Sequence, residues 1–131
     1  MYPGVVELFE SLKNAGIKIC LGSNGGKRSI EKIMENLKIK KYFSSIVTYD
    51  DVSSGKPSPE MFLKNAKNLS LQPNECIVIE DAIEGIRAAH AAGMKVIAVM
   101  STTGKKNLKE ADLIVKTIKD INLKKIQELD D

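Results

Sequence analysis

The sequence lacks the patterns that mark several large classes of protein. No apolar stretch comes near the roughly 18 residues of a membrane span, so we expect no membrane protein. We find no signal-peptide pattern of charged residues followed by an apolar run, so we do not expect a secreted protein either. The 20 lysines and arginines exceed the 17 acidic residues by only three. They form no basic run and no aromatic residues interleave with them, so we expect no nucleic-acid partner.

Cysteine is also scarce. Cys20 and Cys76 each lie in an apolar, β-type run, and neither has the spacing of a metal ligand. We therefore expect two buried, reduced thiols in a cytoplasmic protein. No internal repeat or low-complexity segment occurs. The 131 residues, 43% of them hydrophobic, suit one domain with one core.

The sequence does contain a regular alternation of helical and strand patterns. The predicted helices cover residues 5–12, 30–37, 58–69, 83–92 and 121–129, with a short helical turn at 108–111. The predicted strands cover residues 17–21, 45–49, 75–79, 95–100 and 112–115. Such alternation is typical of an α/β fold with a parallel sheet and helices on both faces. Ligands bind such sheets at the carboxyl ends of the strands.

Two strand-end loops carry groups that suit an anion. Ser23 lies between a strand and a helix, where its hydroxyl and the amides of Asn24 and Gly25 can converge on a phosphate. Lys56 stands between a glycine and a proline, and it can neutralise a phosphate or pair with a carboxylate. Taken singly, the first loop is more often only a turn, and Lys56 is better explained as a surface lysine.

A third strand end carries two acids, Glu80 and Asp81, directly after the most apolar strand. Carboxylates at such a place cost free energy unless they are compensated. A hard cation with oxygen ligands, Mg²⁺ above all, compensates both. Capping of the next helix by Asp81 is the alternative. Together the hydroxyl, the lysine and the carboxylate pair describe a site for a metal-bound phosphoryl group.

Three runs, in this order, resemble the haloacid dehalogenase superfamily, and most of all its β-phosphoglucomutase and phosphoglycolate phosphatase-like subgroup. They are Leu21-Gly22-Ser23-Asn24, Gly55-Lys56-Pro57-Ser58-Pro59-Glu60 and Ile79-Glu80-Asp81-Ala82-Ile83-Glu84-Gly85-Ile86. The resemblance covers nearly the whole chain. It implies a Rossmann-like three-layer fold and a Mg²⁺-dependent phosphatase or phosphomutase acting on a small phosphorylated metabolite.

The resemblance also implies roles for the residues of these runs. Ser23 would hold the phosphoryl oxygen with help from the Asn24 amide, and Lys56 would neutralise the phosphate and the nucleophile. Glu80 and Asp81 would bind Mg²⁺. Asp50 and Asp51 are interpreted as loop solvation, and His90 as structural.

One departure from the family is large. Its members begin with an apolar strand ending in Asp-x-Asp, which supplies the nucleophile and the general acid/base, and no such motif occurs in this sequence. The chain opens at Met1-Tyr2-Pro3-Gly4, which resembles the point where family members re-enter the core after a helical cap. Residues 1–131 are therefore expected to be a partial core domain, the part after the cap, missing the first, central strand.

The expected gap lies between the strand ending at Ser23 and the strand ending at Asp81. Either these strands pair directly, or another chain fills the gap, or the segment is not a stable unit; unpaired edges favour self-association. Two other functions are compared with the phosphotransferase. A receiver domain has its acids before its lysine, contrary to the order here. A non-catalytic binding module derived from the same core is supported by the missing nucleophile, whereas a shortened form of a longer enzyme would also lack it. The chain alone is expected to be inactive.

Overall fold

The computed structural model describes residues 4–100 and 108–130, so the opening residues 1–3 lie outside the described part. The helices are α1 (Val5–Asn14), α2 (Lys27–Leu37), α3 (Glu60–Asn68), α4 (Ile83–Ala91) and α5 (Leu123–Asp130). The strands are β1 (Ile19–Gly22), β2 (Phe43–Val47), β3 (Ile77–Glu80), β4 (Lys95–Val99) and β5 (Leu113–Val115). The predicted elements are all present, and the α/β class is confirmed.

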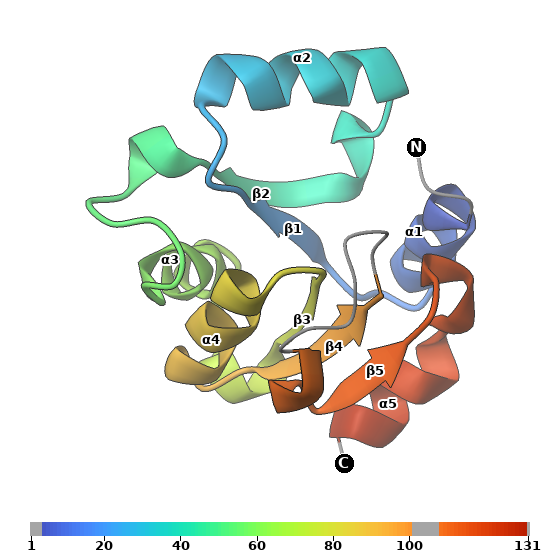
Figure 1. Cartoon of the computed structure of the whole chain (residues 1–131). Coiled ribbons are helices and arrows are strands. Elements are labelled where there is room, and N and C mark those ends of the chain that lie inside the picture. The colour runs from blue at the N-terminus through green and yellow to red at the C-terminus, as the bar shows by residue number, and fades with distance from the viewer. Residues whose placement is uncertain (1–3, 101–107, 131) are drawn as a thin grey trace.

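The strands form two separate parallel sheets rather than one (Figure 1). β1 pairs with β2, and β3 pairs with β4, which in turn pairs with β5. Within the described residues no ladder joins β1 to β3. Direct pairing of these two strands, one of the three outcomes considered for the missing strand, does not occur.

The backbone directions show which groups face the gap between the sheets. The Ser23 N–H donates to the Val47 carbonyl at 3.0 Å, so Ser23 faces β2, and by strand alternation Cys20 and Gly22 face away from it. On the other side, the Val96 carbonyl accepts from the Asp112 N–H near β5, which turns Ile97 towards β3. The register then leaves the backbone groups of Ile77 and Ile79 facing the gap.

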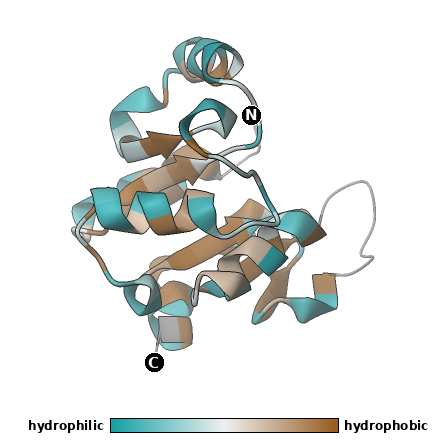
Figure 2. Cartoon of the chain, turned by 90° about the vertical axis from the view of Figure 1, so that its left-hand side faces the viewer, coloured by the Kyte–Doolittle hydropathy of each residue, from teal (hydrophilic) through white to brown (hydrophobic). Residues whose placement is uncertain are grey.

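Helices cover both faces of the strands, as Figure 1 shows, with α3 and α4 on one side and α1 and α5 on the other. Buried residues of α3, α4, β3 and β4 form one core cluster, and α1, α5, β4 and β5 contribute to a second. Figure 2 shows the hydrophobic residues concentrated on the strands. None of the helices described is both long and apolar enough to cross a membrane.

Two details differ from the prediction. The second strand begins and ends two residues earlier than residues 45–49. It ends at Val47 because Thr48 and Asp51 form a capping box that turns the chain into a 3₁₀ helix, Tyr49–Asp51. Cys20 and Cys76 are free thiols, but they are half-buried rather than buried. Cys20 lies in β1 and Cys76 directly precedes β3, the two strands that border the gap between the sheets, which accounts for their partial exposure.

A buried polar network, which the apolar pattern could not predict, fixes α3 to the smaller sheet. Asn65 is 3% exposed, its Oδ1 accepts from the Ser45 hydroxyl at 2.7 Å, and its Nδ2 donates to the Leu21 carbonyl at 3.0 Å. Asn68 donates to the same hydroxyl. Because buried polar groups cost free energy unless they are hydrogen-bonded, this network sets the position of α3 beside the loop that carries the predicted lysine.

Candidate functional site

Ser23 lies just beyond the end of β1, in the turn before α2. Its Oγ accepts a hydrogen bond from the Gly25 N–H at 3.0 Å. A serine hydroxyl has one donor and two acceptor positions, so this bond orients the oxygen and leaves the O–H proton available for an anion. The Gly25 amide, which the sequence suggested as a direct anion donor, is used here to position Ser23.

The Asn24 side chain ties this turn to the loop that carries Lys56. Its Oδ1 accepts a hydrogen bond from the Lys56 N–H at 2.9 Å. Gly55 packs so closely that a Cβ there would lie 2.6 Å from the Asn24 Oδ1. The sequence suggested a role for the Asn24 amide; the contact made by its side chain joins residues 32 apart and has no signal in a local pattern.

The Lys56 side chain reaches the end of β3. Its ammonium lies 2.7 Å from Glu80 Oε2, and the two side chains are only 12% and 11% exposed. The ammonium also lies 5.2 Å from the centre of the Phe62 ring, within the range of a cation–π contact. The contacts from Asn24 to Lys56 to Glu80 therefore bring the three predicted stretches together.

Glu80 and Asp81 differ in their surroundings. The second oxygen of Glu80, Oε1, accepts a hydrogen bond from the Asp81 N–H at 3.1 Å, while Asp81 itself is exposed. Gly85 lies directly beneath Glu80, since a Cβ at position 85 would overlap the Glu80 carboxylate. α4 begins with Ala82 at its N-cap position and no side-chain cap, so capping by Asp81 was the wrong alternative.

The chemistry of these donors fits Mg²⁺. This ion is usually held by one or two carboxylates and completes its shell with waters and substrate phosphates. Glu80 and Asp81 supply two carboxylates at the end of β3, and Glu80 is connected to the Ser23 turn through Lys56 and Asn24. No group of three or more His, Cys, Asp or Glu side chains that could cage a metal occurs in residues 4–100 and 108–130, so the two acids would hold the ion with water and phosphate.

The remaining acids and the histidine have structural partners. Asp50 accepts from the Lys27 N–H at 2.7 Å and so caps α2, whose N-cap position is a glycine. Asp51 caps its own turn, and the backbone hydrogen bond from Thr48 is the main cause that lowers its pKa. Both acids are exposed, as the interpretation of loop solvation expected, but each also has a capping role. His90 lies 2.9 Å from Asp112, which confirms its structural interpretation.

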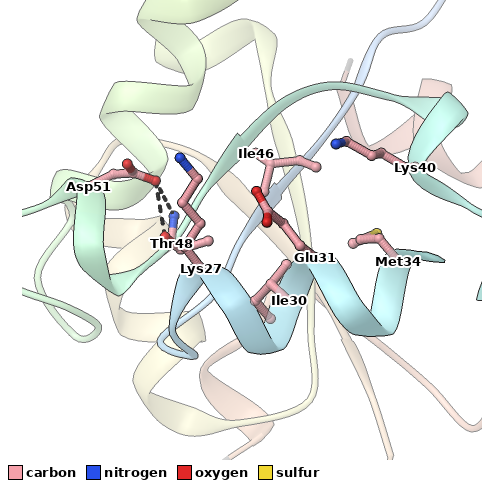
Figure 3. Close-up of a pocket in the computed structure, with 8 residues that line it drawn as sticks. All are labelled: Lys27, Ile30, Glu31, Met34, Lys40, Ile46, Thr48 and Asp51. Carbon is pink, nitrogen blue, oxygen red and sulfur yellow. Dashed lines mark hydrogen bonds between the residues drawn. The ribbon is translucent and has the colours of Figure 1, made fainter. Parts of the chain in front are cut away.

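A cavity of about 190 Å³ lies between α2 and the edge of β2 (Figure 3). Its charged lining residues are Lys27, Glu31, Lys40 and Asp51. Two cations and two anions cancel, and the Asp51 carboxylate is already bonded to Thr48. With its charges balanced, the cavity has no electrostatic preference for a phosphate. None of the predicted site residues lines it, so it does not belong to the site.

Comparison with known proteins shows which family the sequence resembles. Residues 1–99 match the model of the haloacid dehalogenase-like hydrolase family. A bifunctional riboflavin kinase/FMN phosphatase of Arabidopsis thaliana is 44% identical over 125 residues, which cover 94% of this chain and 33% of that protein. The β-phosphoglucomutase of Bacillus subtilis is 38% identical over 128 residues, or 98% and 54%.

The fold matches solved structures equally well. The crystal structure of a β-phosphoglucomutase from Clostridium difficile superposes with a TM-score of 0.87 at 33% identity, covering 99% of this chain and 56% of the other. The chain thus spans between a third and just over half of the length of these relatives.

Proposed function

Because the chain belongs to the haloacid dehalogenase-like hydrolase family, we propose that the intact protein is a Mg²⁺-dependent phosphatase or phosphomutase acting on a small phosphorylated metabolite. Residues 1–131 are the part of its core that follows the cap, and they supply the phosphate and cation positions. The observation that carries this proposal is the continuous set of contacts from Asn24 through Lys56 to Glu80.

The proposal gives each residue a role that its geometry supports. The Ser23 hydroxyl, oriented by the Gly25 N–H, donates to a phosphoryl oxygen. The Lys56 ammonium neutralises a second oxygen, and its main chain is held in place by Asn24. Glu80 and Asp81 would hold Mg²⁺, which when bound supplies positive charge against the phosphoryl oxygens. The transfer step itself needs a carboxylate nucleophile in line with phosphorus, which the residues of this site do not provide.

A longer form of the protein that carries an upstream Asp-x-Asp strand tests the proposal. It is to be assayed with and without Mg²⁺ on sugar phosphates, phosphoglycolate and FMN, the last because a phosphatase of FMN is among the relatives. We expect Mg²⁺-dependent release of phosphate or isomerisation of a sugar phosphate. Ser23→Ala should lower kcat/KM by about a hundredfold, the usual scale for losing one stabilising donor. No turnover of any phosphate ester would refute the proposal.

The 131-residue chain by itself should release no phosphate above a Ser23→Ala, Asp81→Ala double variant. The second candidate function, a non-catalytic binding module, is favoured by one observation: the sequence contains no Asp-x-Asp motif. Binding of a phosphorylated metabolite by the chain, together with inactivity of every longer form, would favour the module.

A further inference from the structure

Glu80, which the proposed function assigns to a cation, is paired with the Lys56 ammonium in the structure. One oxygen of Glu80 lies 2.7 Å from the lysine ammonium, and the other accepts the Asp81 N–H. Because Gly85 has no side chain, the Glu80 carboxylate can pack directly against the first turn of α4. Because both side chains of the pair are nearly buried, solvent screens their attraction only weakly.

The main chain of Lys56 lies beside the Ser23 turn, the proposed phosphate position. Its N–H is bound to the side chain of Asn24, the neighbour of Ser23. The flexible four-carbon stem of a lysine allows its ammonium to exchange between partners. From this fixed main chain, the Lys56 ammonium pairs with Glu80 in the structure, and an anion at the Ser23 turn would be its competing partner.

We propose that Lys56 is a latch on the cation position: its ammonium and a divalent cation compete for the Glu80 carboxylate, and a phosphate group at the Ser23 turn releases that carboxylate by attracting the ammonium. The proposal rests on the proposed function for the places of the phosphate and the cation. By linkage, whatever phosphate does to the affinity for the cation, the cation does to the affinity for phosphate. The site therefore takes up the two ligands together.

Titration calorimetry of MgCl₂ into the 131-residue chain tests the competition without any catalytic readout. Lys56→Met removes the ammonium, so it should tighten Mg²⁺ binding by about tenfold, within the usual range of coupling between two sites. Lys56→Arg keeps a cation that pairs with carboxylates and should show no such tightening of Mg²⁺ binding. Lys56→Gln is a second neutral variant, to be used if the methionine variant does not fold.

Two controls separate a latch from a general change in charge. Lys27→Met removes the same charge from a lysine outside the site and should leave the Mg²⁺ affinity unchanged. In a Glu80→Gln background, Lys56→Met should no longer tighten binding, because the carboxylate that was competed for is gone. An equal gain in that background, or with Lys27→Met, overturns the proposal, as does absence of Mg²⁺ binding by every variant.

Inorganic phosphate provides the second arm of the test. Saturating phosphate should raise the Mg²⁺ affinity of the unchanged chain by several-fold more than that of Lys56→Met, because only the former has a latch to release. Equal enhancement in both chains overturns the release step. These results do not depend on turnover: a longer form that hydrolyses no phosphate ester would refute the proposed function while the competition at Glu80 stood.

Discussion

Gly85 shows how a single missing side chain shapes the site. A glycine inside a helix normally destabilises it, and replacement by alanine gains about 0.5–1 kcal/mol. At this position the added Cβ would overlap the Glu80 side chain. The carboxylate would have to move away from Lys56, so the cost of overpacking and of the broken pair should exceed the helical gain.

We therefore expect Gly85→Ala to lower the free energy of unfolding by about 1–3 kcal/mol, the usual cost of overpacking. Urea denaturation followed by circular dichroism measures this change. Ser29→Ala, at an exposed position of α2, is the matched control and should be neutral or slightly stabilising. A Gly85→Ala variant as stable as the unchanged chain would show that Glu80 can be displaced freely.

Cys20 offers a second test at the scale of one residue. Burial, with a smaller contribution from the nearby Cys76 thiol, raises the pKa of Cys20 to about 11. Since only the thiolate reacts, alkylation of Cys20 by iodoacetamide in a Cys76→Ser variant should be about two orders of magnitude slower at pH 8 than that of a free thiol. The rate should rise about tenfold for each pH unit up to pH 10. A rate that levels off near pH 9 would contradict the assignment.

At the scale of elements, Asp112 joins α4 to the sheet. Its Oδ2 lies 2.9 Å from His90 Nε2 and accepts a hydrogen bond from the Val96 N–H at 2.8 Å. Burial acts to raise the pKa of Asp112, but the hydrogen bonds with His90 and with the Val96 amide outweigh it and lower the pKa below its usual value. The ionised form is therefore the one that stabilises the fold.

A lowered pKa in the folded state means that the stabilisation is present above the unfolded pKa, about 3.9, and is lost as pH falls through the folded pKa. Asp112→Ala should cost about 1 kcal/mol at pH 7, because the carboxylate is more than a third exposed. The difference from the unchanged chain should shrink below about pH 4. Urea denaturation from pH 7 to 2.5 measures it, with exposed Glu35→Ala as control. A difference independent of pH would exclude the role of ionisation.

The elements that the sequence predicted best are those whose signals are local. The apolar spacing that predicted α1 and α3 reappears in their buried faces, at Leu8 and Leu12 and at Phe62 and Ala66. What it could not predict depends on contacts between distant residues. Asp50 caps α2 from 23 positions away, and Asn65 is buried only because Ser45 and Leu21 meet it. The same is true of the site. The sequence predicted its residue types, but it could not predict the hydrogen bond from the Lys56 N–H to Asn24, which joins residues 32 positions apart.

At the scale of the whole molecule, the division into two sheets is the dominant feature. Every residue of β1 is half-buried, and Ile79 of β3 is 36% exposed. Strands of a parallel sheet covered by helices are normally buried on both faces. The two inner edges therefore combine partly exposed apolar side chains with backbone groups that no ladder pairs within residues 4–100 and 108–130. Such edges are templates for pairing with another chain.

This arrangement predicts that the 131-residue chain self-associates or is only marginally stable. Each backbone group left unpaired in an apolar setting costs about 1–3 kcal/mol, and Cys20, Gly22, Ile77 and Ile79 all direct theirs towards the gap. A domain has a net stability of only about 5–15 kcal/mol, so several such groups are a large fraction of it. A strand from a second chain would pair with these edges and bury Ile79, whereas isolation leaves the cost in place.

Sedimentation equilibrium together with thermal unfolding at several protein concentrations distinguishes these cases. We expect either a monomer–oligomer equilibrium with a Tm that rises with concentration, because association stabilises the folded chain by mass action, or a monomer that melts below about 45 °C, the lower end of the usual range for mesophile domains. Ile114→Lys is the control variant, since Ile114 is exposed on β5, away from the gap. A buried position such as Val47 on β2 is unsuitable, because a lysine there would disturb the core. Ile114→Lys should leave association unchanged, whereas Ile79→Lys places a charge beside the gap and should weaken it. A monomer at all concentrations with a Tm well above 65 °C would mean that the two inner edges carry no such cost.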